Sequence, residues 1–184
     1  MCRMSRILIV GDSQSGNPGI VAQRKLEALG HSVQKIENDG KGPYDYVRLS
    51  DLWNSYVGAV NSFRPDIILL IFGHNDAPND NLRSALTRMK QSVRPKVLLS
   101  GPPQYADPAQ QAIGDQVKAI HQQVFGGDFI DAYPFTSTSL PHQPPTATFP
   151  INPHFTLTGA EPWGDAMANE VQRRLAHPLV GGHV

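Results

Sequence analysis

Residues 6–15 read RILIVGDSQS, a short apolar run that ends in a glycine and leads into a serine. Residues 7–10 are all apolar, mostly β-branched and without polar alternation, which predicts a strand buried on both faces of a parallel sheet. Ser13 would then lie just past the carboxyl end of that strand. Because ligands of open α/β sheets bind in the crevice outside the carboxyl ends of the strands, the Ser13 hydroxyl is a candidate for chemistry.

Stretches of strand and helix length alternate along the rest of the chain. Further strands are expected at residues 31–36, 66–72, 96–100 and 128–131. Helices are expected at residues 17–30, 50–62, 80–92, 108–124 and 157–175. This order predicts an α/β protein, a three-layer α/β/α sandwich with a five-stranded parallel sheet. We expect one domain over residues 1–176, followed by a C-terminal tail over residues 177–184.

Two of the helices carry cap signals. Asn17 followed by Pro18 predicts that Asn17 is the N-cap of the first helix. Thr158 and Glu161 have the spacing of a capping box at the start of the last helix.

Two segments are expected to lack regular structure. Residues 38–43, NDGKGP, are rich in turn-forming residues, so we expect a loop there. Residues 132–153 are rich in proline, serine and threonine and have no apolar period. A loop of that length in a compact domain is usually functional or disordered, and this one leads to His154.

The charge balance limits the class of partner. Among 184 residues, 16 are Lys or Arg and 16 are Asp or Glu, so no net positive charge would attract nucleic acid or an anionic membrane. The first apolar run is too short for a signal peptide or a membrane span. We therefore expect neither a nucleic-acid nor a membrane partner and, by default, a cytoplasmic protein, with leaderless export left open.

Neither a metal nor another cofactor is expected. Cys2 is the only cysteine. No pair of His, Cys, Asp or Glu shows a convincing spacing for metal ligands.

Three polar residues fall where this architecture would bring them together: Ser13 after the first strand, Asn75 after the third, and His154 before the last helix. A serine hydroxyl needs an adjacent base to act as a nucleophile, and a neutral imidazole supplies one. An asparagine amide and backbone N–H groups can stabilise the oxyanion of acyl transfer. The three residues therefore predict acyl-transfer chemistry.

These motifs resemble the SGNH (GDSL-type) hydrolases. The matching features are Gly-Asp-Ser at residues 11–13, a glycine loop after the second strand, Gly-His-Asn-Asp at residues 73–76 and a late histidine, and the resemblance runs over residues 7–175. It implies a flavodoxin-like SGNH hydrolase fold.

The resemblance also implies a role for each site residue. Ser13 would be the nucleophile and would donate one oxyanion-hole N–H, while the Asn75 side chain and the backbone of Gly42 would complete the hole. His154 would be the general base. Gly42 is preferred to Gly40 because the family pattern places the working glycine second, although this loop is one residue shorter.

One position departs from the family. The aspartate that typically precedes the histidine by three residues is replaced here by Ile151. Asn152, Asp131 or a backbone carbonyl near Ile151 could orient the ring instead. Asp12 and Asp76 are expected to brace the loops, so we expect a working serine–histidine dyad.

The leading hypothesis is a serine esterase that hydrolyses a carboxylic ester through an acyl-enzyme. Its substrate would be a small-molecule or carbohydrate ester. By analogy with the family, the preferred substrate is a short acyl group such as acetyl on a carbohydrate. A thioesterase or lipid esterase of the same fold is an alternative. So is a non-catalytic module that binds a glycan, or a flavodoxin-like module that binds a phosphate through residues 13–17. The oligomeric state is left open.

The aromatic residues permit two interpretations. Four of them could line a sugar-binding cleft or pack into the core: Tyr44, Tyr46, Trp53 and Tyr56. Trp163 is expected in the core. His74 lies inside the second motif, where it could contact substrate or be an exposed loop residue.

Overall fold

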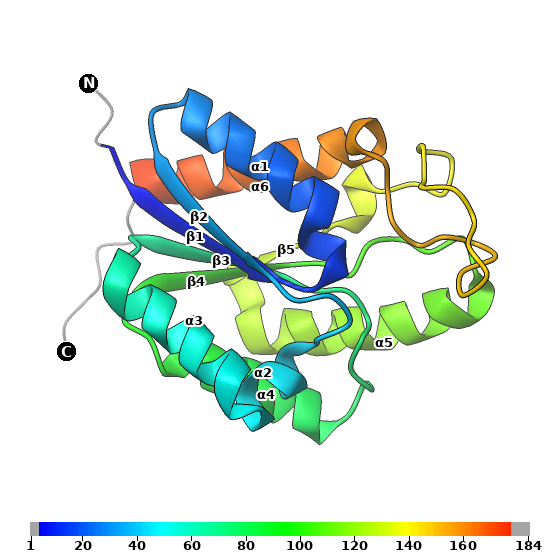
Figure 1. Ribbon diagram of the computed structural model, residues 1–184, viewed down its shortest axis with the longest axis horizontal. Helices are drawn as coiled ribbons and strands as arrows, with labels where there is room; N and C mark the ends of the chain where they lie inside the picture. The colour runs from blue at the N-terminus through cyan, green and yellow to red at the C-terminus, as the bar shows by residue number, and fades with distance from the viewer. Residues whose placement is uncertain (1–3, 178–184) are drawn as a thin grey trace.

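The computed structural model of the protein describes residues 4–177 (Figure 1). Its centre is a parallel sheet with the strand order β2-β1-β3-β4-β5. The strands are β1 (Arg6–Gly11), β2 (Ser32–Glu37), β3 (Ile67–Ile71), β4 (Lys96–Ser100) and β5 (Phe129–Ile130). The prediction of a five-stranded parallel sheet is confirmed.

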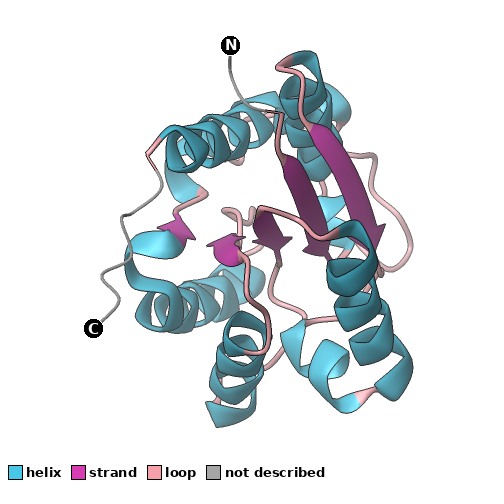
Figure 2. Cartoon of the chain, turned by 90° about the vertical axis from the view of Figure 1, so that its left-hand side faces the viewer, coloured by secondary structure: helices cyan, strands magenta, loops and turns pink. Residues whose placement is uncertain are grey.

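Helices cover both faces of the sheet (Figures 1 and 2). The α-helices are α1 (Gly16–Ala28), α2 (Pro43–Arg48), α3 (Ser50–Phe63), α4 (Asp80–Gln91), α5 (Pro108–Phe125) and α6 (Leu157–Ala176). Short 3₁₀ turns lie at η1 (Ser13–Ser15), η2 (Gly126–Asp128) and η3 (Tyr133–Phe135). α1 and α6 pack on one face, and α3, α4 and α5 on the other, which gives the predicted three layers.

The two faces are built from alternate residues of the same strands. Ile7 and Ile9 of β1 belong to the core under α1 and α6, whereas Leu8 and Val10 belong to the core under α3 and α4. All four side chains are fully buried. The unbroken apolar run is therefore explained by a strand with protein on both sides.

Trp163 fills the core beneath α6. It is fully buried, and its indole Nε1–H donates to Ser100 Oγ across 2.8 Å. The expectation that Trp163 is a core residue is confirmed.

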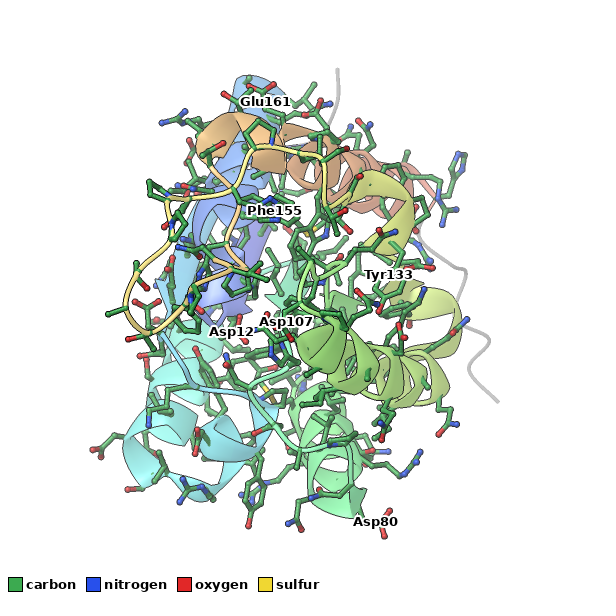
Figure 3. The ribbon with its side chains drawn as sticks, turned by 90° about the vertical axis from the view of Figure 1, so that its right-hand side faces the viewer. Asp12, Asp80, Asp107, Tyr133, Phe155 and Glu161 are labelled. Carbon is green, nitrogen blue, oxygen red and sulfur yellow. The ribbon has the colours of Figure 1, made fainter. Side chains whose placement is uncertain are left out.

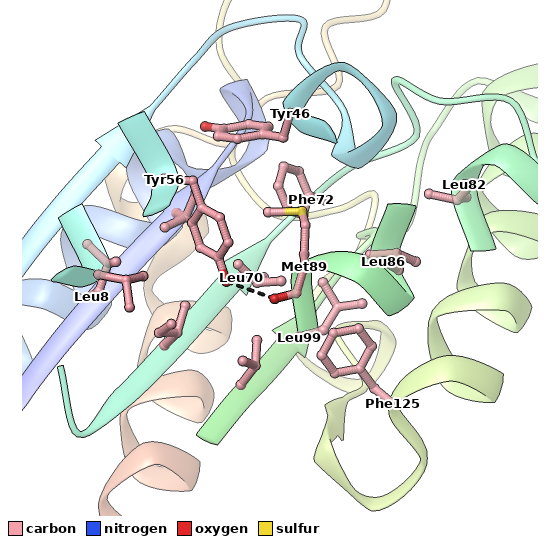
Figure 4. Close-up of a cluster of buried hydrophobic side chains, with 14 of the residues drawn as sticks. Leu8, Tyr46, Tyr56, Leu70, Phe72, Leu82, Leu86, Met89, Leu99 and Phe125 are labelled. Carbon is pink, nitrogen blue, oxygen red and sulfur yellow. Dashed lines mark hydrogen bonds between the residues drawn. The ribbon is translucent and has the colours of Figure 1, made fainter. Parts of the chain in front are cut away.

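Two of the four aromatic residues considered for a sugar cleft lie in the core under α3 (Figure 4). Tyr46 and Tyr56 are fully buried, and the Tyr56 hydroxyl donates to the Met89 carbonyl at 3.0 Å. Trp53 is partly buried, with the Arg88 guanidinium 4.5 Å from the centre of its ring. The core interpretation therefore holds for Tyr46 and Tyr56.

The predicted cap of α1 is wrong. The helix begins at Gly16, directly after η1, with Ser15 as its N-cap. Asn17 does not cap because its side-chain amide donates to the Phe155 carbonyl at 2.7 Å, which ties α1 to the loop before α6.

The predicted capping box of α6 is also wrong. Thr156 is the N-cap, and its Oγ1 accepts the N–H of Gly159 at 3.1 Å. Thr158 lies inside the first turn, where it cannot act as the cap, and Pro162 is accommodated within the helix.

The glycine-rich loop after β2 is shorter than predicted. Residues 38–42 lack a helix, but Pro43 begins α2, with Gly42 as its N-cap. Proline at the first helical position loses nothing, because its missing N–H would have no partner there.

Residues 136–156 form a long loop beyond the carboxyl ends of the strands, in yellow and orange at the right of Figure 1. The β-pairing within this loop is one isolated antiparallel bridge between His142 and Phe155. Apart from His177, the predicted tail lies outside the described residues. Within residues 4–177, no helix combines the length and apolar character that crossing a membrane requires.

Candidate active site

Ser13 lies two residues beyond the end of β1, as the first residue of η1. The turn needs Gly11, because a Cβ there would lie 2.1 Å from the carbonyl oxygen of Ile71 in the neighbouring strand. Asp12 caps η1 by accepting the N–H of Gln14 at 2.8 Å. The Gly-Asp-Ser sequence thus makes a tight strand-to-turn junction that presents the Ser13 hydroxyl.

The long loop brings His154 to Ser13. His154 Nε2 lies 2.9 Å from Ser13 Oγ, although the two residues are 141 positions apart in the chain. Gln14 supports this arrangement by donating its side-chain amide to the Pro153 carbonyl at 3.5 Å. The candidate nucleophile and base are therefore in direct contact. Figure 3 looks onto this side of the molecule, with Asp12 and Phe155 labelled.

Asn152 occupies the place of the missing carboxylate. Its Oδ1 lies 2.9 Å from His154 Nδ1 and accepts the backbone N–H of the same residue at 3.0 Å. Its Nδ2 donates to the Pro144 carbonyl at 2.8 Å, which fixes the orientation of the amide. Because Oδ1 is only an acceptor, Nδ1 of His154 carries the proton and Nε2 is free to accept from Ser13.

The other two alternatives for orienting the ring are not realised. Asp131 forms an ion pair with Lys118 at 2.8 Å. The side chain of Ile151 is 46% exposed, and Asn152 Oδ1, rather than a carbonyl near Ile151, faces the ring.

Asp12 links the nucleophile to the loop that carries Asn75. Its Oδ2 accepts the side-chain amide of Asn75 at 2.7 Å and the backbone N–H of Gly73 at 2.9 Å. Asp12 is fully buried, and burial raises its pKa to about 7 against the opposing effect of its hydrogen bonds. Asn75 keeps a second amide hydrogen that is not used by Asp12.

Asp76 links the same loop to Gly42. Its Oδ2 accepts the backbone N–H of Tyr44 at 2.7 Å, and a Cβ on Gly42 would lie 2.5 Å from its Cγ. Gly40, by contrast, faces open space with a φ of 67°. Gly42 therefore needs to be glycine because of its neighbour, and Gly40 because of its backbone conformation.

The backbone N–H groups of Ser13 and Gly42 donate to no other group within residues 4–177. With the second Asn75 hydrogen, they are donors that could receive the oxygen of a tetrahedral intermediate.

The fold resembles solved structures at low sequence identity. A putative GDSL-like lipase from Parabacteroides merdae aligns with a TM-score of 0.64 and 12% identity, over 93% of this chain and 98% of its own. The SGNH hydrolase fold is thereby established. No protein-family model matches the sequence, and no curated protein matches it.

The same SGNH fold is found in proteins named for two activities. The acetyl xylan esterase AlAXEase aligns with a TM-score of 0.60 and 17% identity, over 90% of this chain and 99% of its own. The C-terminal catalytic domain of a peptidoglycan O-acetyltransferase from Streptococcus pneumoniae aligns with a TM-score of 0.60 and 14% identity, over 92% of this chain and 94% of its own. The likeness thus extends over nearly the whole SGNH domain of each.

The pKa of His154 is lowered, which favours the neutral imidazole, the form that can act as a base. Burial lowers the pKa of His154, while the negative charges of Asp39 and Glu37 act in the opposite direction. Burial and the nearby His154 also lower the pKa of His74, whose ring packs edge-on against Tyr105 at 4.3 Å. His74 is partly buried there rather than exposed.

A cleft of about 320 Å³ opens beside the serine and histidine of this SGNH fold. Its walls include Ser13, His154, Phe155, Gln143, Glu37 and Asp39. The sequence analysis missed Glu37 and Asp39. Glu37 is the last residue of β2, so it could have been found by the argument used for Ser13, that ligands bind at the carboxyl ends of parallel strands. Among residues 4–177, no three His, Cys, Asp or Glu side chains are grouped as metal ligands.

Proposed function

We propose that the protein is a serine esterase that cleaves a carboxylic ester through an acyl-enzyme. The observation that carries this proposal is the 2.9 Å contact between Ser13 Oγ and His154 Nε2, with the amide of Asn152 behind the ring. A serine, a neutral imidazole and a group that fixes its tautomer are the parts that acyl transfer requires.

In the first half of the reaction, Ser13 Oγ attacks the ester carbonyl carbon while His154 Nε2 takes the hydroxyl proton. The imidazolium donates its Nδ1–H to Asn152 Oδ1. Three donors receive the oxyanion: the N–H groups of Ser13 and Gly42 and the Asn75 amide. The tetrahedral intermediate collapses, and His154 returns the proton to the departing alcohol.

In the second half, water takes the place of the alcohol. His154 Nε2 removes a proton from water as its oxygen attacks the acyl carbon. The second tetrahedral intermediate uses the same donors, and its collapse returns the proton to Ser13 Oγ and releases the acid. Each proton that His154 accepts is thus given back within the same half-reaction.

The substrate we propose is a short acyl group, such as acetyl, on a carbohydrate. Support comes from similar structures, which include the acetyl xylan esterase and a two-domain esterase active on acetylated mannans, of whose length this chain covers 50%. The cleft also has the polar side chains of Gln143, Glu37 and Asp39 on its walls, which suit the hydroxyl groups of a carbohydrate alcohol.

Acyl transfer to a sugar hydroxyl is a second candidate. It is favoured by similar structures that are acetyltransferases, from Salmonella and from Streptococcus pneumoniae. The same acyl-enzyme serves both reactions, and only the acceptor differs. Release of acetate in water, compared with acetylation of added oligosaccharide, separates the two candidates.

The test is hydrolysis of p-nitrophenyl acetate together with labelling by a fluorophosphonate probe. We expect turnover and labelling of Ser13 in the intact protein, loss of both in Ser13→Ala, and loss of turnover in His154→Ala. Ser55→Ala is the matched control, because Ser55 is exposed on α3.

Absence of turnover and of Ser13 labelling in the folded wild type would overturn the proposal. Phosphate or flavin retained by the purified protein, with no turnover, would favour the binding-module alternative. Faster cleavage of acyl thioesters or long-chain esters than of acetyl esters would favour the thioesterase or lipid esterase.

A further inference from the structure

Two carboxylates, from the end of β2 and the loop after it, line the cleft beside Ser13 and His154. Glu37 is the last residue of β2, and Asp39 follows two residues later. Both line the cleft together with Ser13 and His154. Glu37 Oε1 lies 3.3 Å from the position that a Cβ on Gly16 would take, so its carboxylate rests against the first residue of α1.

One lysine balances part of this charge. Lys35 Nζ forms an ion pair with Glu37 and also lies 3.4 Å from the Gly16 carbonyl, to which it donates. Within residues 4–177, no cationic side chain forms an ion pair with Asp39. With His154 neutral, the three charged residues give this end of the cleft one net negative charge.

The carboxylates lie on the side where an alcohol would leave. His154 must return a proton to the departing alkoxide, so the alcohol portion of an ester occupies the space next to the imidazole. The cleft that contains Glu37 and Asp39 is lined by Ser13 and His154 but not by Asn75 or Gly42, two of the three proposed oxyanion donors. The charges of both carboxylates also reach His154, as their effect on its pKa shows.

We propose that this cleft selects esters whose alcohol portion carries a positive charge, in the form of a protonated amine on a sugar, and that Glu37 and Asp39 make the selection. The inference rests on the proposed esterase function and names the charge class of its substrate. A cationic group beside the carboxylates gains Coulomb energy, and a carboxylate or phosphate on the substrate is repelled.

The opposing explanation is that Glu37 and Lys35 form a purely structural ion pair. Such a pair accounts for Glu37 but leaves Asp39 as a surplus charge on the wall of the cleft. The two explanations differ in what they predict for substrates of equal shape and different charge.

The test compares acetylcholine with its uncharged isostere 3,3-dimethylbutyl acetate and with the anionic ester 4-acetoxybutanoate. The quaternary ammonium is used because it cannot take up the acetyl group itself. We expect kcat/KM to fall in the order cationic, neutral, anionic, with about a threefold advantage for acetylcholine over the neutral isostere. The advantage should disappear in 1 M NaCl, where charges are screened over about 3 Å.

Three variants change the charge of the cleft in known directions. Asp39→Asn and Glu37→Gln each remove one negative charge and should bring the cationic-to-neutral ratio of kcat/KM close to unity. Lys35→Gln removes a positive charge and should raise the ratio. The ratio is the right measure because any change in the basicity of His154 affects both substrates equally. Asp80→Asn is the control, since Asp80 is 99% exposed at the start of α4, far from Asp12 in Figure 3.

The outcomes separate this inference from the proposed function. Hydrolysis of all three esters with a ratio of one, unchanged in Asp39→Asn and Lys35→Gln, would overturn the inference and leave the esterase in place. Failure to hydrolyse any ester or to label Ser13 would overturn the esterase, and the inference with it.

Discussion

The side-chain amide of Asn75 donates to the buried carboxylate of Asp12 across 2.7 Å. The residue directly before the candidate nucleophile therefore holds the candidate oxyanion donor in place. The same carboxylate also accepts the backbone N–H groups of Gly73 and Gln14. One buried side chain thus ties the end of β1 to the loop after β3.

Replacing Asn75 by alanine should lower kcat by about 10²- to 10³-fold, because one donor to the oxyanion is lost. KM should change much less, since the donor acts mainly in the transition state. Asp12 keeps its two backbone donors, so the free energy of unfolding should fall by only about 1 kcal/mol. Steady-state kinetics with p-nitrophenyl acetate and urea denaturation measure the two effects. Asn54→Ala, on the exposed side of α3, is the matched control. An equal loss in Asn54→Ala, or an unchanged kcat in Asn75→Ala, would contradict the assignment.

The buried carboxylate of Asp12 should make stability depend on pH. Its pKa is about 7 in the folded protein, above the ordinary value of 3.8, so between these values the folded state binds the proton more tightly. The free energy of unfolding should therefore fall as the pH rises from about 4 to about 7, on the order of a few kcal/mol. Asp12→Asn should remove this part of the fall. Urea denaturation of both proteins at pH 5 and pH 8 gives the comparison, and equal pH dependence in the two would refute the prediction.

Two glycines of one loop should respond differently to alanine. In Gly42→Ala the new Cβ would meet Asp76, so the loop must shift and kcat should fall by about 10²-fold. In Gly40→Ala the Cβ meets open space, but the positive φ should destabilise the fold by about 1–2 kcal/mol while kcat is kept. Kinetics and thermal unfolding of the pair decide which glycine serves the site. The reverse pattern would assign the role to Gly40.

Asn152 should act through the orientation of His154. Asn152→Ala removes the acceptor for Nδ1–H and should lower kcat by about 10²-fold, the lower end of what a positioned general base contributes. Ile151→Ala, at the exposed neighbour, should leave kcat unchanged.

Asn152→Asp provides a second readout for the same residue. A carboxylate there stabilises the imidazolium, so the acid limb of the kcat/KM profile should move to higher pH. It cannot donate to the Pro144 carbonyl as the amide does, so the variant should also be less stable by about 1–3 kcal/mol. A purely structural role for Asn152 would leave the acid limb where it is.

The sequence was sufficient for the sheet because buried parallel strands leave a strong pattern. Residues 66–72 could hardly be anything but a central strand, and β3 occupies Ile67–Ile71. The contact between Ser13 and His154 followed from the resemblance and the strand order, and the structure contains it.

The errors came from contacts that local sequence cannot reveal. Asn17 has every local property of an N-cap, but its amide bonds to the Phe155 carbonyl instead. The residue that orients His154 could not be chosen among three alternatives, because Asn152 is held by the Pro144 carbonyl within an irregular loop. A lone acidic residue in a turn carries no local signal, so the position of Asp39 on the wall of the cleft could not be predicted from the sequence.

The attachment of the base to a loop has a consequence for control of the reaction. Ser13 follows a central strand, whereas His154 and Asn152 both belong to residues 136–156, where regular pairing is limited to one bridge. Withdrawing that loop would remove the proposed proton acceptor together with its orienting amide and leave the proposed oxyanion donors assembled. In the proposed mechanism, the group that transfers protons and the groups that hold the oxyanion therefore belong to separate segments of the chain, so displacing residues 136–156 would stop turnover without removing the groups that bind a tetrahedral analogue.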